Sequence, residues 1–89
     1  MNRYYREPDH IIDLHGCTRE EARYMLDDVC FQYDFKTVRI ITGKGNHNPE
    51  GVGILRSFVQ QYLRGHNFSF RPARIEHGGD GAFEVTLRT

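Results

Sequence analysis

The sequence of 89 residues contains no tryptophan, two cysteines, three prolines and no excess of either charge. No apolar run approaches the roughly 20 residues that a membrane-spanning helix requires, so we expect no membrane partner. The first nine residues are polar and charged, which is unlike a signal peptide. A net charge of zero argues by itself against a strongly basic nucleic-acid-binding protein. These absences favour an intracellular protein, cytoplasmic or nuclear.

Length and aromatic content limit the size of the core. A chain of 89 residues has room for one small domain, which we assign to residues 10–89 and expect to be monomeric in isolation. Five tyrosines and six phenylalanines help to fill its core. Residues 1–9 are predicted to form a poorly ordered N-terminal tail.

The charges are unevenly distributed although they cancel. Residues 1–34 carry four basic and eight acidic side chains, a net charge of −4, and residues 35–89 carry eight basic and four acidic side chains, a net charge of +4. A neutral chain of this kind can still present a basic face to a polyanion. Two ordinary solvated faces are the alternative interpretation.

Two helices are predicted from capping and periodicity. Thr18-Arg19-Glu20-Glu21 has the form of a capping box, which places a helix start at Thr18. An apolar stripe follows at helical spacing and comprises Ala22, Leu26, Val29, Cys30 and Tyr33. A second helix is predicted over residues 52–64, with Gly65 and Asn67 as its stop and a stripe of Leu55, Phe58, Val59, Tyr62 and Leu63.

The first predicted helix also decides whether the two cysteines can form a disulfide with each other. Cys17 and Cys30 lie at its two ends, about 20 Å apart at 1.5 Å per residue. A disulfide requires Cα atoms within about 7 Å. The prediction is therefore two reduced thiols, as in an intracellular protein.

Four strands are predicted, over residues 10–14, 37–42, 70–76 and 82–88. Pro72 places the third strand at a sheet edge or makes it a strand start, and residues 77–81 form a turn before the fourth. The element order is βαβαββ. Strand–helix–strand units imply parallel neighbours, and the last two strands form an antiparallel hairpin. The predicted fold is α/β, a two-layer sandwich with a four-stranded mixed sheet and both helices on one face.

Asp13 and His15 are the first candidate functional residues. Side chains alternate along a strand, so Ile12 and Leu14 are predicted under the helices and Asp13 and His15 on the opposite, open side. A carboxylate and an imidazole side by side suit proton transfer or metal binding. The alternatives are a turn-forming aspartate and a partly buried histidine at a strand end.

A glycine-rich loop follows the second predicted strand. Thr42-Gly43-Lys44-Gly45 places a lysine between two glycines, whose backbone N–H groups allow close approach to a phosphate. The spacing is not that of a Walker loop. A solvent-exposed lysine in a turn is the alternative. Arg56, early in the second predicted helix, is a further candidate phosphate contact.

In this order and spacing, the motifs resemble the Smr (small MutS-related) domain family. Ile11-Ile12-Asp13-Leu14-His15-Gly16 is similar to the family's L-D-L-H-G motif, and Thr42-Gly43-Lys44-Gly45 to its H/T-G-x-G motif. The segment from Asn46 to Val52 resembles a longer form of that loop, and Gly78-Gly79-Asp80-Gly81-Ala82 completes the match. The resemblance covers about residues 10–88.

The resemblance implies a βαβαββ fold, binding to DNA or RNA and, as in several members, endonucleolytic nicking. It assigns cleavage to Asp13 and His15 and nucleic-acid binding to residues 42–45. Many members have histidine at the position of Thr42, and His47 is the candidate that would replace it here. Mg²⁺ or Mn²⁺ is the candidate cofactor, with Asp13 as its candidate ligand.

Two other functions fit the same sequence. One is a non-catalytic nucleic-acid-binding module that recognises its target by shape. The other is a protein-interaction domain that docks a partner on the open face of the sheet.

Overall fold

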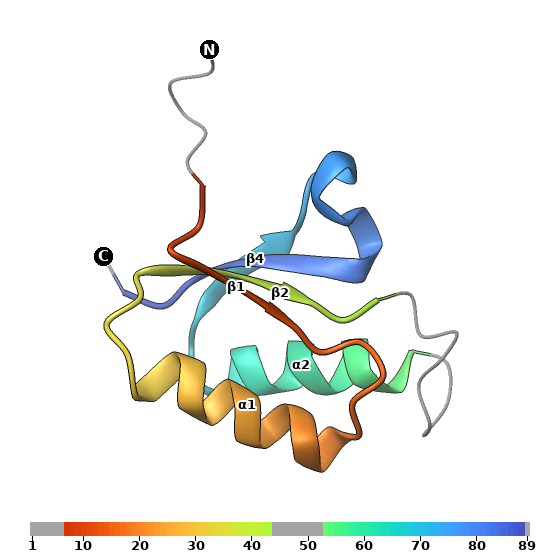
Figure 1. Ribbon diagram of the computed structural model, residues 1–89, viewed down its shortest axis with the longest axis horizontal. Helices are drawn as coiled ribbons and strands as arrows, with labels where there is room; N and C mark the ends of the chain where they lie inside the picture. Colours follow the sequence, from red (N-terminus) through yellow and green to blue (C-terminus); the bar gives the residue numbers. More distant parts are fainter. Residues whose placement is uncertain (1–6, 44–52, 89) are drawn as a thin grey trace.

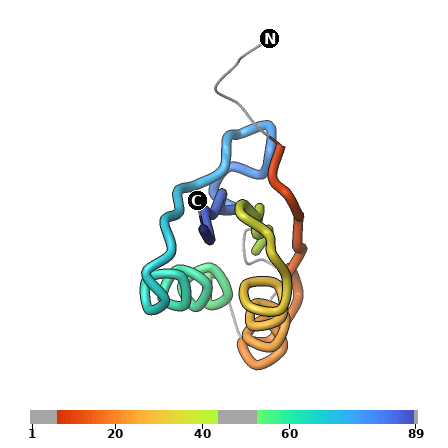
Figure 2. Tube along the Cα trace, turned by 90° about the vertical axis from the view of Figure 1, so that its left-hand side faces the viewer, coloured from red at the N-terminus to blue at the C-terminus, as the bar shows by residue number. Residues whose placement is uncertain are grey.

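The computed structural model describes residues 7–43 and 53–88. Its elements are β1 (His10–Asp13), α1 (Arg19–Phe31), β2 (Thr37–Ile41), α2 (Ile54–Gly65), β3 (Ser69–Pro72), the 3₁₀ turns η1 (Ile75–His77) and η2 (Gly79–Gly81), and β4 (Ala82–Thr86) (Figure 1). Both helices lie side by side on one side of the four-stranded sheet (Figure 2). The predicted two-layer α/β sandwich is confirmed.

The strand order in the sheet is β1-β2-β4-β3. β1 pairs with β2 in parallel, as a right-handed strand–helix–strand unit requires. β4 pairs antiparallel with both β2 and β3. The prediction that α2 also connects neighbouring parallel strands is therefore wrong, because β4 lies between β2 and β3.

Pro72 explains why β3 is at the edge. Proline has no N–H to donate, so a strand that contains it is best placed where only one side is paired. β4 alternates Phe83 and Val85, which are 1% and 2% exposed, with polar residues, and so suits an inner position. β3 also ends four residues earlier than predicted, at Pro72. The chain then turns through η1 and η2 on the side of the sheet away from the helices (Figure 1).

α1 begins with the predicted capping box. The Thr18 hydroxyl accepts a hydrogen bond from the Glu21 N–H at 3.1 Å, and the Glu21 carboxylate accepts one from the Thr18 N–H at 2.9 Å. The stripe predicted for this helix is buried except at its last member. Tyr33 is 52% exposed, because α1 ends at Phe31 and the helical spacing no longer applies beyond it.

α2 extends from Ile54 to Gly65, two residues later at its start than predicted. Gly53 precedes it with a φ of 78°, a left-handed conformation that glycine adopts without a Cβ clash. Asn67 ends the segment with a φ of 60°, as predicted for the helix stop.

The core lies between the helices and the sheet. Its centre is formed by side chains that are at most 6% exposed and come from β1 and the residue after it, from β2 and β4, and from both helices; they include Ile12, Leu14, Leu26, Val38, Ile40, Leu55, Val59, Leu63, Phe83 and Val85. Cys30 is buried and Cys17 partly buried, and neither forms a disulfide with a described residue. No helix within the described residues is long and apolar enough to cross a membrane.

Asp9 is the residue directly before β1, and its hydrogen bonds fix where the chain joins the sheet. Its carboxylate accepts hydrogen bonds from the backbone N–H groups of Lys36 and Thr37, at 2.7 and 3.3 Å. Its own N–H donates to the Thr37 carbonyl at 3.0 Å. Asp9 thus ties the start of β1 to the start of β2. Residues 1–6 of the predicted tail lie outside the described residues, and the tail remains a prediction.

Candidate functional site

Asp13 and His15 lie where β1 ends. Ile12 and Leu14 on either side of Asp13 point into the core and are 5% and 0% exposed, as the alternation predicts. The side chains of Asp13 and His15 are 49% and 68% exposed. Both candidate groups are therefore accessible to a large substrate.

The two side chains are in direct contact. His15 Nδ1 lies 2.7 Å from Asp13 Oδ1, and the His15 backbone N–H donates to the same oxygen at 3.0 Å. When Nδ1 carries the proton of this contact, Nε2 of the exposed ring holds the lone pair. The turn-forming alternative placed the local bond of Asp13 on the Gly16 or Cys17 backbone, but the observed bond comes from the His15 N–H and occurs together with the side-chain contact.

The environment keeps Asp13 ionised. Partial burial raises the pKa of this carboxyl, but the hydrogen bonds from the His15 ring and the His15 backbone outweigh burial and bring the pKa below its ordinary value. A carboxylate that stays charged at neutral pH can hold an adjacent imidazole in one tautomer and stabilise its protonated form. The pair therefore has the geometry and charge of a general base with its orienting group.

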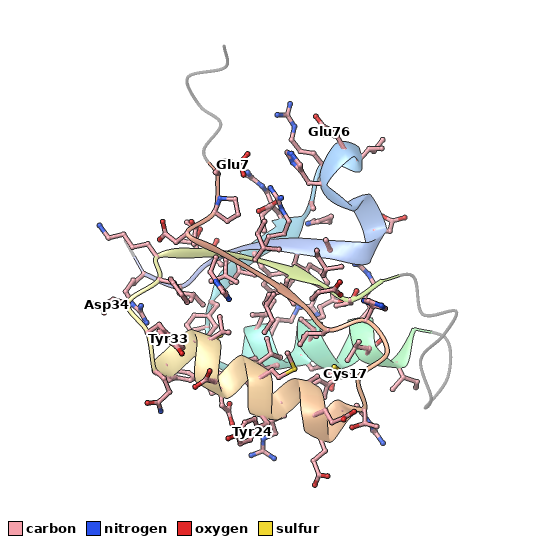
Figure 3. All side chains as sticks on the ribbon, in the orientation of Figure 1. Glu7, Cys17, Tyr24, Tyr33, Asp34 and Glu76 are labelled. Carbon is pink, nitrogen blue, oxygen red and sulfur yellow. The ribbon has the colours of Figure 1, made fainter. Side chains whose placement is uncertain are left out.

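Cys17 lies in the turn that leads from this pair into α1 (Figure 3). Burial raises the pKa of the Cys17 thiol, and the negative charges of Glu21 and Asp13 raise it further. Because the thiolate is the nucleophilic form, this environment disfavours a catalytic role for Cys17.

Thr42 and Gly43 continue β2 toward the glycine-rich loop. Their backbone N–H groups both donate to the carbonyl of Gly81, at 2.8 and 3.0 Å. Thr42 is 3% exposed, and its hydroxyl donates to the carbonyl oxygens of Gly43 and Gly81. Thr42 thus shapes the backbone at the loop entrance, and its direct contact with a nucleic acid stays a prediction.

Gly43 joins the two predicted motifs in space. A β-carbon placed on Gly43 would lie 3.2 Å from Cβ of His15. The φ of Gly43 is 72°, a conformation that favours glycine. The chain therefore enters the loop immediately beside His15. Lys44, Gly45 and His47, the other predicted loop contacts, lie outside the described residues.

Arg56 packs against the same region from α2. Its guanidinium donates to the Asp80 carbonyl, and its central carbon lies 4.3 Å from the centre of the Phe83 ring. These contacts connect α2 to η2, the turn whose Gly81 carbonyl supports Thr42 and Gly43. The predicted phosphate contact of Arg56 stays a prediction, but the side chain also has a structural position next to the site.

Gly81 also belongs to the site, although the sequence predicts only a turn over residues 77–81. A β-carbon on Gly81 would lie 3.2 Å from the Gly43 carbonyl carbon, so a larger residue would push the two backbones apart. In the sequence, this role is indicated only by the position of Gly81, a glycine directly before the alternating residues of β4. Which loop this glycine touches depends on the strand order, since β4 is the neighbour of β2.

A divalent ion fits this site only in one binding mode. Within the described ranges, no group of three or more His, Cys, Asp or Glu side chains is arranged to hold a metal. Mg²⁺, however, is often held by one or two carboxylates together with substrate phosphates. Asp13, ionised and half-exposed, suits that mode as a single protein ligand.

The fold and these motifs define the chain's class: it belongs to the Smr domain family, whose model matches residues 12–88. The Smr domain of Thermus thermophilus MutS2 superposes with a TM-score of 0.75 at 30% identity, over 90% of this chain and 99% of that one. Ribosome rescue factor SmrB of Vibrio cholerae is 33% identical over 90% of this chain and 42% of its own length. Endonuclease MutS2 of Clostridium botulinum is 32% identical over 96% of this chain and 11% of its own length.

The chain therefore spans less than half the length of the curated relatives that it matches. Their names associate the family with an endonuclease and with ribosome rescue. Membership of this family supports a nucleic-acid-related role for the chain.

Proposed function

We propose that this domain binds the phosphodiester backbone of DNA or RNA and nicks it. The observation that carries the proposal is the exposed Asp13–His15 pair, in contact at 2.7 Å, directly beside the entrance to the lysine-containing glycine loop. Similarity to a protein named Endonuclease MutS2 supports the same function.

His15 is proposed as the general base. With Nδ1 held by Asp13, its exposed Nε2 accepts a proton from a water molecule, or from a ribose 2′-hydroxyl, as the oxygen attacks phosphorus. Asp13 orients the ring and stabilises the imidazolium that forms. The protonated ring can then return the proton to the leaving oxygen.

The glycine loop is proposed to bind the adjacent phosphate. Lys44 supplies the charge and the flanking glycines allow the strand to approach the backbone. Asp13 would also hold Mg²⁺ or Mn²⁺ if the reaction uses one, and the ion would supply charge neutralisation at the phosphate.

The test is a comparison of nicking and binding by matched variants. Wild type, Asp13→Asn, His15→Gln and the double variant are incubated with a supercoiled plasmid and with labelled RNA, with and without Mg²⁺ or Mn²⁺. Asp28→Asn, an exposed carboxylate on α1, is the control. We expect His15→Gln to reduce nicking by about 10²–10⁴-fold, the usual contribution of general base catalysis. Binding measured by anisotropy should change little in all variants.

Three outcomes separate the candidate functions. Equal nicking by wild type and the double variant would remove Asp13 and His15 from the mechanism. Binding without nicking by the wild-type domain would identify a non-catalytic nucleic-acid-binding module. Absence of both would favour the protein-interaction domain.

A further inference from the structure

The face of the sheet away from the helices carries polar side chains in two rows across the strands. Thr37 pairs with Thr86, which pairs with Ser69, and this gives a row of three hydroxyl groups. The next row consists of Arg39, Glu84 and Arg71, which are paired in the same way. The helices cover the other face of the sheet (Figure 2).

A hollow of about 240 Å³ lies over these rows. Its lining includes Thr37, Ser69 and Thr86 from the hydroxyl row and Arg71 and Glu84 from the charged row. Pro8, in the N-terminal segment, also lines it. Pockets for whole small molecules usually measure about 300–1,000 Å³. The hollow is therefore better suited to one sugar–phosphate unit of a longer strand than to a free metabolite.

The charge available in the hollow comes from Arg71. Arg39 Nε donates to Glu84 Oε2 at 2.7 Å, and the Arg39 side chain is only 8% exposed. This pair is nearly buried and its charges cancel. Arg71 is exposed on the neighbouring strand and forms no ion pair with another described residue. An exposed guanidinium of this kind matches the geometry of a phosphate group.

The hydroxyl row adds donors beside this cation. The Thr37 hydroxyl oxygen accepts a hydrogen bond from the Asp9 N–H at 3.2 Å, which leaves its own O–H to donate. Ser69 and Thr86, which line the same hollow, each carry a further hydroxyl. Hydroxyl groups next to arginine are common partners of phosphate and sugar oxygens.

The hollow lies on the same side of the sheet as Asp13. Asp13 is one row further along, since it pairs with Ile41 and Ile41 pairs with Ala82. Strands lie about 4.8 Å apart, so β1 and β3 are separated by roughly 14 Å across the sheet. Arg39 lies between the two places and is only 8% exposed, so a strand would pass along the rim of this face rather than straight across it, and it would still reach both places within a few nucleotides.

We infer that the hollow around Arg71, Ser69 and Thr86 is a second phosphate-binding subsite, which holds the substrate strand a few nucleotides from the Asp13–His15 pair. The inference rests on the proposed function and adds a path for the strand over the open face of the sheet. Neither the glycine loop nor the family motifs contain these residues.

The test measures binding of a short fluorescein-labelled single strand, in RNA and in DNA form, in the Asp13→Asn background to prevent cleavage. Arg71→Ala should raise the Kd roughly tenfold, as expected for loss of one charge-assisted contact. It should also reduce the slope of log K against log salt by about 0.7, the value for one phosphate contact on a single strand. Arg23→Ala, which removes the same charge from α1, is the matched control and should leave both values unchanged.

A second variant tests the hydroxyls without a change of charge. Ser69→Ala combined with Thr86→Val should weaken binding several-fold and leave the salt slope as it is, because uncharged groups release no counterions. An unchanged Kd and salt slope for Arg71→Ala, in a domain that binds the strand, would overturn this subsite and leave the proposed function standing. Failure to bind either single strand, in a domain that still nicks the plasmid, would overturn the subsite alone. Failure to bind the strands and to bind or nick the plasmid would overturn both proposals.

Discussion

Among single residues, Gly43 has a strict conformational requirement directly beside His15. Its φ of 72° is unfavourable for residues with a Cβ, and the added atom would press on Cβ of His15 at 3.2 Å. We predict that Gly43→Ala lowers the free energy of unfolding by about 1–2 kcal/mol, the usual cost of a left-handed residue. It should also reduce nicking, because His15 has to move. Urea denaturation and the plasmid assay measure the two effects.

Gly65 provides the control for this substitution. It is the last residue of α2, its φ is not positive, and a β-carbon there would meet nothing within 4 Å. Gly65→Ala should be neutral or should stabilise the domain by up to about 1 kcal/mol, since alanine favours the helix. Equal losses of stability at the two glycines would contradict the role given to Gly43.

At the level of elements, the site depends on how α2 holds the η2 turn. Arg56 is the connection, through the Asp80 carbonyl and the face of Phe83. We predict that Arg56→Ala costs about 1–2 kcal/mol of stability, from the lost hydrogen bond and the lost cation–π contact. Nicking should fall further than stability alone explains, because Gly81 then supports Thr42 and Gly43 less firmly.

Arg64 is the matched arginine on the same helix, and its guanidinium lies 6.0 Å from the centre of the Phe70 ring. Arg64→Ala should change stability and nicking much less than Arg56→Ala. Measurements of thermal unfolding and plasmid nicking on both variants compare the two arginines. If both variants nick equally well at the same folded fraction, the connection through Arg56 is not needed for the site.

At the level of the whole molecule, the Asp9 carboxylate, which ties the start of β1 to the start of β2, contributes to the change of stability in acid. Hydrogen bonds from the backbone N–H groups of Lys36 and Thr37 hold the pKa of Asp9 below its ordinary value of 3.8. As the pH falls below that value, the unfolded chain takes up a proton more readily than the folded one, so stability decreases. The contribution is complete above the ordinary value and is lost as the pH falls through the lowered pKa.

We therefore predict that Asp9→Asn makes stability less dependent on pH. The variant should be less stable than wild type near neutrality, and the difference should shrink as the pH falls below 3.8 and through the lowered pKa of Asp9. Urea denaturation across this range measures it, with Asp28→Asn on the surface of α1 as a control that should follow wild type. A constant difference at every pH would show that the Asp9 carboxylate is not the titrating group.

Local patterns predicted much of the fold correctly. The capping box at Thr18 and the helical stripe after it involve residues within a few positions of each other, so their physics is contained in the sequence. The apolar stripe of α1 was predicted to continue to Tyr33, which is exposed, because the apolar spacing continues by chance into the turn after the helix. β3 was predicted too long because Ile75, which is 92% exposed, has the composition of a strand residue.

The sequence by itself determined the helices, the alternation of β1 and hence the shared side of Asp13 and His15, since each follows from the geometry of neighbouring residues. Only the tertiary structure decided that β4 lies between β2 and β3, that the Gly81 carbonyl supports the loop entrance, and that Arg56 connects α2 to it. These contacts join residues far apart in the chain. Packing of the whole sheet against both helices selects them, and no local pattern encodes that choice.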